Sequence, residues 1–159
     1  MSYLPDPILL VEDNPDDAAL TLRAFRRNQV SNPIVVARDG IEALDFLFAR
    51  DAFADRAGQP LPKLVLLDLK LPRLDGIGVL REIRADPRTR LVPVIMLTSS
   101  LLEQDLDACY SLGANSYLVK PIDYAEFVEM TRIIATYWLT LNRPPPSSLP
   151  LSMPMIDPL

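Results

Sequence analysis

The sequence predicts an α/β fold, in which five helices surround a doubly wound parallel sheet of five strands. Two observations support this prediction. Five short apolar segments alternate along the chain with longer segments of helical spacing, which is the order of a parallel sheet joined by helical crossovers. The apolar segments are also continuous rather than interrupted by polar residues, as expected for strands that are covered on both faces.

The five expected strands are short, and the first four consist almost entirely of apolar residues. The fifth is marked mainly by the turn signal Gly113-Ala114-Asn115 before it. The predicted strands are Ile8–Val11, Ile34–Ala37, Leu64–Leu67, residues 94–97 and Ser116–Val119.

Apolar residues recur at helical spacing between these strands, and local signals mark several helix ends. Asn14-Pro15 has the pattern of an N-cap followed by proline in the first turn, Asp39-Gly40 opens the second helix, and Asp86-Pro87 ends the third. The predicted helices cover residues 18–25, 41–48, 77–84, 102–112 and 124–141.

Two segments lack a regular pattern. Residues 50–63 are rich in Ala, Asp, Gly and Pro, which predicts a loop with room for a short helical extension. Residues 143–159 contain six prolines, which exclude a regular helix or a central strand. We therefore expect one domain over residues 1–142, then a Pro-rich tail over residues 143–159 and no separate output domain. Two interpretations of the tail stay open, a disordered end or an arm packed on a neighbouring subunit.

The composition excludes several classes of function. The chain has 159 residues, with 16 Lys+Arg, 21 Asp+Glu, one Cys and no His, so its formal net charge is −5. Without His it cannot form a Ser-His-Asp triad or a His-based zinc site, nor donate a phosphoryl group from its own imidazole. A single Cys excludes an internal disulfide. Mild acidity disfavours nucleic-acid binding, and there is no signal peptide or membrane-spanning segment, so we expect a cytoplasmic protein.

Polar side chains follow four of the predicted strands. Glu12 and Asp13 come after the first strand, Asp68 after the third, Thr98 after the fourth and Lys120 after the fifth. In open parallel sheets, ligands bind at the carboxyl ends of the strands. One acid at a strand end is usually a helix cap or a solvated group, but convergence from several strands is harder to explain that way. Carboxylates in this number suit Mg²⁺, so the sequence predicts a magnesium site.

Four motifs contain these residues: VEDNPDD, LLDLKLPRLDG, VIMLTSS and GANSYLVKP. In type, order and spacing they resemble the motifs of bacterial two-component response regulator receiver domains, and the resemblance covers residues 8–141. It implies a flavodoxin-like strand order of 2-1-3-4-5. It also implies a phosphoacceptor in a phosphorelay, which is not an enzyme beyond its own phosphoryl uptake and slow autodephosphorylation.

The resemblance assigns roles to residues at the strand ends. Asp68 would be the phosphoacceptor. Asp13 would bind Mg²⁺ directly and Glu12 through water, with Asp68 and the backbone carbonyl of Lys70 as further ligands.

Two more residues would contact the phosphoryl group. Thr98 would form a hydrogen bond to it and Lys120 an ion pair, and the Lys120–Pro121 peptide is expected to be cis. Tyr117 would be the switch aromatic, which turns inward when Thr98 moves toward the phosphoryl oxygen.

The output face would consist of the fourth helix, the fifth strand and the fifth helix. Tyr137 and Trp138 are adjacent on the predicted fifth helix, so they cannot both face the core. An exposed aromatic side chain is a candidate anchor for a partner, and we expect a homodimer through this face. The partner would be a histidine kinase, which supplies the phosphohistidine. The segment NPIVVARDGIEALDFLF and the insertion over residues 50–63 resemble the single-domain regulators paired with bacterial phytochromes.

Three alternatives fit the sequence less well. A phosphatase of the haloacid dehalogenase type also uses an Asp with Mg²⁺, but the residue two after Asp68 is Lys70 instead of an acid. An FMN-binding flavodoxin would need a phosphate-binding loop after the first strand, where this chain is acidic. A pseudo-receiver that serves only as a scaffold would not need the complete acidic set.

Overall fold

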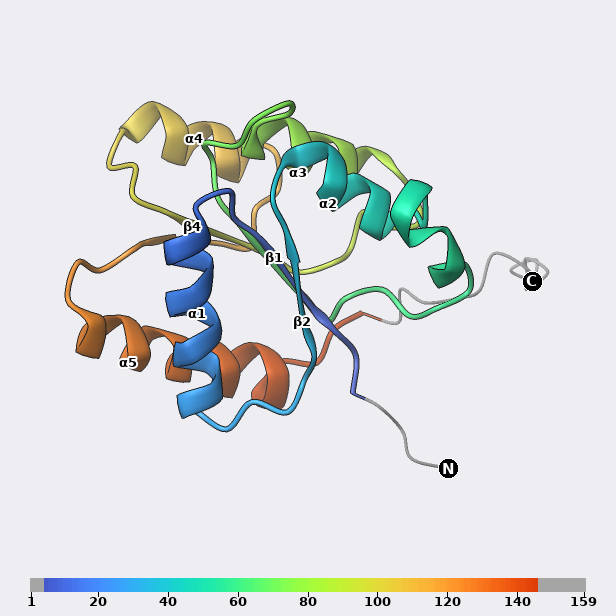
Figure 1. Ribbon diagram of the computed structural model, residues 1–159. Helices are drawn as coiled ribbons and strands as arrows, with labels where there is room; N and C mark the ends of the chain where they lie inside the picture. Colours follow the sequence, from blue (N-terminus) through green and yellow to red (C-terminus); the bar gives the residue numbers. More distant parts are fainter. Residues whose placement is uncertain (1–4, 146–159) are drawn as a thin grey trace, which may run out of the picture.

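The protein is a five-stranded parallel sheet between two layers of helices, in the computed structural model that describes residues 5–145 (Figure 1). The strand order is β2-β1-β3-β4-β5, as the resemblance implied. Four strands have the predicted bounds, and β4 extends one residue further, to Thr98. The strands are β1 Ile8–Val11, β2 Ile34–Ala37, β3 Leu64–Leu67, β4 Val94–Thr98 and β5 Ser116–Val119.

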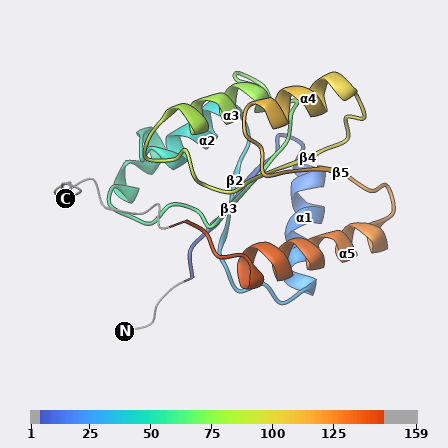
Figure 2. The same ribbon diagram turned by 180° about the vertical axis from the view of Figure 1, so that it is seen from behind.

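Helices α1 and α5 cover one face of the sheet, and α2, α3 and α4 cover the other (Figures 1 and 2). All five are close to the predicted segments, although α4 ends one residue earlier and α5 is shorter. The helices are α1 Pro15–Arg27, α2 Gly40–Leu47, α3 Gly76–Ala85, α4 Glu103–Ser111 and α5 Tyr124–Ile134.

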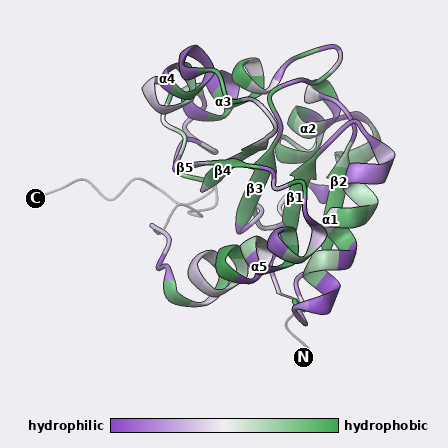
Figure 3. Cartoon of the chain, turned by 90° about the vertical axis from the view of Figure 1, so that its left-hand side faces the viewer, coloured by the Kyte–Doolittle hydropathy of each residue, from purple (hydrophilic) through white to green (hydrophobic). Residues whose placement is uncertain are grey.

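Successive residues of the central strands supply the two sides of the core. In β1, Leu9 and Val11 pack toward α2 and α3, while Ile8 and Leu10 pack toward α1 and α5. All residues of β1 and β3 are buried, which explains why the sequence shows apolar runs without alternation. Figure 3 shows the result: hydrophobic strands in the centre and helices whose surfaces carry hydrophilic residues. Each fully buried Leu, Ile or Val contributes about 1.5–3 kcal/mol to folding.

The irregular segment over residues 50–63 contains the short helix that the sequence allowed, a 3₁₀ helix η1 over Asp51–Arg56. Phe53 of this helix packs edge-on against Phe46 of α2, with ring centroids 5.3 Å apart. The guanidinium of Arg56 lies 3.5 Å from the Phe46 ring centroid and donates to the carbonyl of Phe46. The insertion is therefore held on α2.

The predicted fifth helix, residues 124–141, is helical throughout, but its second half is not an α-helix. After Ile134 the α-helix widens into a π-helix η2 over Ala135–Leu141, which ends where the Asn142 amide donates to the carbonyl of Tyr137. The Nζ of Lys63, far away in the sequence, donates to the carbonyl of Leu139 at 3.0 Å. This contact joins residues 76 positions apart, so the sequence pattern could not indicate it.

Tyr137 and Trp138 lie on η2 and point to different environments, as their adjacency required. Tyr137 is 49% exposed, whereas Trp138 packs against the core under α1 and α5. Their rings contact each other edge-on. The tail prediction falls, from residue 146 onward, outside the described residues. Within residues 5–145, the helices are too short or too polar to cross a membrane.

Candidate phosphorylation and metal site

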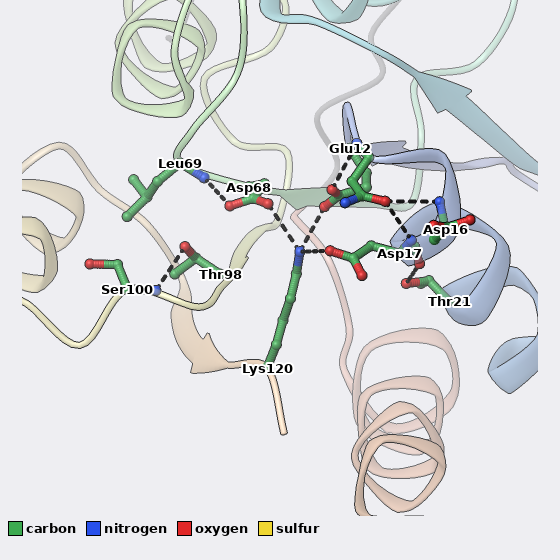
Figure 4. A network of polar contacts seen from close by, with 10 residues as sticks. Glu12, Asp16, Asp17, Thr21, Asp68, Leu69, Thr98, Ser100 and Lys120 are labelled. Atoms are coloured by element: carbon green, nitrogen blue, oxygen red, sulfur yellow. Dashed lines mark hydrogen bonds and ion pairs between the residues drawn. The ribbon is translucent and has the colours of Figure 1, made fainter. Parts of the chain in front are cut away.

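The parallel sheet brings the polar residues after β1, β3 and β5 to one edge, with the ammonium group of Lys120 at their centre (Figure 4). Lys120 Nζ lies 2.7 Å from Glu12 Oε2, 3.0 Å from Asp68 Oδ2 and 3.6 Å from Asp17 Oδ2. Four of the residues named from the sequence, Glu12, Asp13, Asp68 and Lys120, therefore belong to one cluster.

The strand register explains this convergence. Val11 of β1 pairs with Leu67 of β3, so Glu12 and Asp68 both follow directly after paired residues on neighbouring strands. Lys120 continues β5 beyond its last pair, and its amide donates to the carbonyl of Thr98 at 2.8 Å. Its side chain therefore crosses the end of β4 to reach β3 and β1, a span that the long lysine side chain allows.

Burial and close like charges determine the protonation of the cluster. Burial, as the largest effect, raises the pKa of Glu12 from 4.5 to about 7; the neighbouring Asp68 also raises it, and the hydrogen bond from Lys120 opposes them. Burial alone would lower the pKa of Lys120, but Glu12 and Asp68 outweigh this effect and raise it. Lys120 is therefore a fixed positive charge that holds several carboxylates together.

The acidic residues have the arrangement that a divalent cation needs. Glu12, Asp13 and Asp68 each offer a carboxylate oxygen, and these oxygens lie within 4.8 Å of one another. Glu12 is buried, Asp68 is half-buried and Asp13 is exposed, so the cluster opens to solvent on the Asp13 side. Asp13 and Lys70 line the same hollow beside the β3–α3 loop. Oxygen ligands in this number fit Mg²⁺, which usually keeps several waters.

Comparison with known proteins identifies this arrangement. The family model for the response regulator receiver domain matches residues 8–132 of the chain. The chain belongs to this family. The bacteriophytochrome response regulator AtBRR is 47% identical, over 87% of this chain and 98% of AtBRR, with a TM-score of 0.70.

Two further relatives cover most of this receiver domain. The probable methanogenesis regulatory protein FilR2 of Methanothrix harundinacea is 43% identical over 141 residues, which is 89% of this chain and 88% of FilR2. Response regulator Rcp1 of Synechocystis sp. is 36% identical over 135 residues, which is 85% of this chain and 90% of Rcp1. The structure of the Mn²⁺-bound form of Rcp1 covers 89% of this chain and 99% of that chain, with a TM-score of 0.80. The family assignment made from the motifs is therefore confirmed.

Asp17 is a further acidic residue of the Lys120 cluster, which the sequence did not indicate. Asn14 caps α1 by accepting hydrogen bonds from the amides of Asp16 and Asp17, at 2.9 and 3.2 Å, and its own amide donates to Glu12 Oε1 at 3.1 Å. This cap fixes the first turn of α1, so that the Asp17 carboxylate faces Lys120. The N-cap signal at Asn14 was visible in the sequence, but the contact with Lys120, about a hundred positions later, was not.

The residues assigned to the switch are connected through Ser100, a link that the sequence analysis also missed. The Ser100 amide donates to Thr98 Oγ1 at 3.2 Å, and the Ser100 carbonyl accepts from the Tyr117 hydroxyl at 3.1 Å. The Ser100 hydroxyl donates to Asp105 Oδ2 of α4 at 2.6 Å. One loop residue thus contacts Thr98, Tyr117 and the start of α4.

One expectation about the site is wrong. The Lys120–Pro121 peptide is trans, not cis. The trans form is the one that X–Pro bonds favour by about 0.5–1 kcal/mol. It is compatible here with Lys120 contacting both Glu12 and Asp68.

Proposed function

We propose that the chain is a phosphoacceptor regulator in which Asp68 receives a phosphoryl group from the phosphohistidine of a partner kinase. The observation that carries this proposal is the placement of Lys120 Nζ between Asp68 and Glu12, beside carboxylate oxygens clustered within 4.8 Å. A carboxylate nucleophile must stay ionised and must tolerate incoming negative charge. Lys120 provides the compensating charge for both requirements.

The transfer needs no acid or base from the chain. A carboxylate oxygen of Asp68 forms a bond to phosphorus while the bond from phosphorus to the donor imidazole breaks, and the imidazole nitrogen keeps the electron pair. One Asp68 oxygen is held by the Leu69 amide at 2.7 Å and the other by Lys120 at 3.0 Å, which orients the carboxylate before the donor arrives. Mg²⁺ bound by Asp13, Asp68, the Lys70 carbonyl and, through water, Glu12 would offset the negative charge of the phosphoryl oxygens. The Mn²⁺-bound form of Rcp1 supports a divalent cation at this site.

The readout proposed for the phosphoryl group starts at Thr98. Its hydroxyl now accepts from the Ser100 amide and keeps a proton to donate, so it can bond a phosphoryl oxygen if the Ser100 loop moves with it. Tyr117 is bonded to the carbonyl of Ser100 and would change its packing as that carbonyl shifts. The result is a population shift between two arrangements of the β4–α4 loop, Tyr117 and α4.

The phosphoacceptor proposal is tested with a small phosphodonor. Incubating the protein with Mg²⁺ and acetyl phosphate should give an acid-stable, alkali-labile phosphoryl adduct, detected by intact mass. Asp68→Asn should abolish the adduct because an amide oxygen is a poor nucleophile. The matched control is Asp75→Asn, which changes another carboxylate near the hollow but keeps the cap on the Gly78 amide, and which should retain the adduct. A parent protein without any adduct would refute the proposal.

We propose a bacterial phytochrome kinase as the phosphodonor in the cell, on the strength of the 47% identity to AtBRR over almost the full length of both chains. The similar identity to FilR2 makes this pairing worth measuring directly. Phosphotransfer from a purified phytochrome kinase should be at least about tenfold faster than from an unrelated histidine kinase. Equal rates would reject the pairing and leave the phosphoacceptor role intact.

The α4–β5–α5 face is the proposed output and dimer face, because exposed apolar side chains occur on all of its elements. They are Leu106 and Tyr110 on α4, Val119 on β5, Ile133 on α5 and Tyr137 on η2.

Sedimentation should show a dimer, and Tyr137→Lys should weaken association at least about tenfold. The control Leu20→Lys, which alters an exposed Leu on α1, should leave association unchanged. Monomer alone at micromolar concentration, with and without a phosphoryl mimic, would reject the dimer.

A phosphatase of the haloacid dehalogenase type is the less favoured candidate. Lys70 stands where that chemistry needs an acid, and its side chain is exposed. Turnover of small phosphate monoesters by the parent protein would favour it.

A further inference from the structure

The loop between β3 and α3 contains a strained turn. The amide of Leu74 donates to the carbonyl of Pro72 at 2.8 Å, which closes a three-residue turn centred on Arg73. Arg73 has a φ of 65°, in the left-handed region that costs an L-residue about 1–2 kcal/mol. A non-glycine residue persists in such a conformation only when its surroundings hold it there.

The start of α2 supplies that support. The Arg73 guanidinium forms a two-point ion pair with Asp39, with Nε 2.9 Å from Oδ2 and Nη2 3.0 Å from Oδ1. The backbones are also in contact, because a Cβ placed on Gly40 would lie 2.0 Å from the carbonyl oxygen of Leu74. The Gly40 amide points to the carbonyl of Pro72 at 3.5 Å.

Asp39 is itself fixed, so it is a firm anchor. It is the N-cap of α2 and accepts from the Glu42 amide at 2.8 Å. Burial raises the pKa of Asp39, but the Glu42 amide and Arg73 outweigh burial and lower it, so the carboxylate stays ionised. The Arg73–Asp39 contact therefore connects the β3–α3 loop to the N-terminal end of α2.

The other end of the loop is held at the phosphorylation site. The Leu69 amide donates to Asp68 Oδ1 at 2.7 Å, and the Leu69 carbonyl accepts from the Gly76 amide at 2.8 Å. Lys70 and Leu71 lie between these contacts and the turn at Arg73, and Lys70 lines the hollow beside Asp13. The position of the Lys70 backbone thus depends on both ends of the loop.

We propose that the Arg73–Asp39 ion pair is a positioning device for the metal site: it holds the strained turn and thereby the Lys70 carbonyl. This inference rests on the proposed function, because it assumes a divalent cation bound by Asp13, Asp68 and that carbonyl. Arg73 is 57% exposed, and an ion pair of this exposure adds only about 0–1 kcal/mol to global stability. The effect on metal affinity should therefore exceed the effect on folding.

The test compares the parent with five variants of the full chain, three of which are single replacements that remove one charge. Asp39→Asn removes the charge and keeps the helix cap, and Arg73→Gln removes the charge and leaves a shorter polar side chain. Arg88→Gln is the matched control, since Arg88 and Asp86 form a similar two-point ion pair at the far end of α3. Two quantities are measured: the Mg²⁺ dissociation constant by calorimetry, and the hydrogen-exchange rates of the Gly40 and Leu74 amides, both of which face the Pro72 carbonyl.

Both site variants should raise the Mg²⁺ dissociation constant roughly tenfold and speed the exchange of the two amides, and the double variant should be no worse than either alone. Arg73→Lys should recover part of the affinity, and Arg88→Gln should match the parent. Unchanged Mg²⁺ affinity in both single variants would overturn the proposal, whether or not the amides exchange faster. If the parent itself binds no Mg²⁺, the proposed metal site fails, and unchanged amide exchange in the variants then overturns the loop-holding role as well.

Discussion

Replacing Lys120 with Met should lower the free energy of unfolding of the metal-free protein by about 2–3 kcal/mol. Lys120 is the shared partner of Glu12 and Asp68, and its side chain is only 15% exposed. Removing one partner of a buried ion pair costs about 3–5 kcal/mol, because it leaves uncompensated charge in the interior. The loss is smaller here because Glu12, with a pKa of about 7, can take up a proton and relieve part of the repulsion.

Urea denaturation in EDTA and in Mg²⁺ measures this effect. Mg²⁺ should restore a large part of the stability of Lys120→Met, because the cation offsets the same carboxylates. The control is Lys63→Met, which removes a lysine bonded to a single backbone carbonyl, that of Leu139. It should cost about 1 kcal/mol and respond to Mg²⁺ as the parent does. Equal stability of Lys120→Met and the parent in EDTA would contradict the central position of Lys120 in the acidic cluster.

Replacing Glu12 with Gln should stabilise the metal-free protein above neutral pH by an amount on the order of 2–3 kcal/mol. The pKa of Glu12 is about 7 in the folded protein, against 4.5 without the fold. Between these values the folded state binds more protons than the unfolded state. The stability of the parent should therefore fall as pH rises from about 4.5 to about 7, and should be level above that range as far as Glu12 is concerned.

The amide side chain of the Glu12→Gln variant does not titrate, so the variant should lose this slope and be more stable than the parent at about pH 8. Unfolding free energies in EDTA across the pH range test this. The control Glu82→Gln changes an exposed carboxylate on α3 and should keep the slope of the parent. A parent stability that rises over the same pH window would contradict the raised pKa. The higher stability of Glu12→Gln should be accompanied by weaker Mg²⁺ binding, because the substitution removes a carboxylate of the proposed metal site.

Local patterns in the chain were enough to predict the strands. Four of the five strands have the predicted bounds because a short apolar run between turn signals has few alternatives in a parallel sheet. The same topology made Glu12, Asp68 and Lys120 predictable as neighbours, since residues that follow parallel strands emerge at one edge. The helices were less certain at their ends, as the π-helix after Ile134 shows.

Contacts between distant helices and loops could not be predicted in this way. Asp17 meets Lys120 only because the Asn14 cap sets the first turn of α1 and because Lys120 crosses the end of β4. The pair of Asp39 and Arg73 joins two residues whose spacing in the sequence carries no signal. Ser100 ends the motif VIMLTSS, but only its position in space connects it to Thr98 and Tyr117.

The fold class, the strand order and the family of the chain could all be predicted from the sequence and its motifs. These features depend on hydrophobic periodicity and on short motifs, which are properties of neighbouring residues. Only the packing of the chain establishes the shared role of Lys120 among its carboxylates and the anchoring of the β3–α3 loop by Asp39. Each of these depends on the packing of segments far apart along the chain, which fixes distances and burial and therefore the charges at the site.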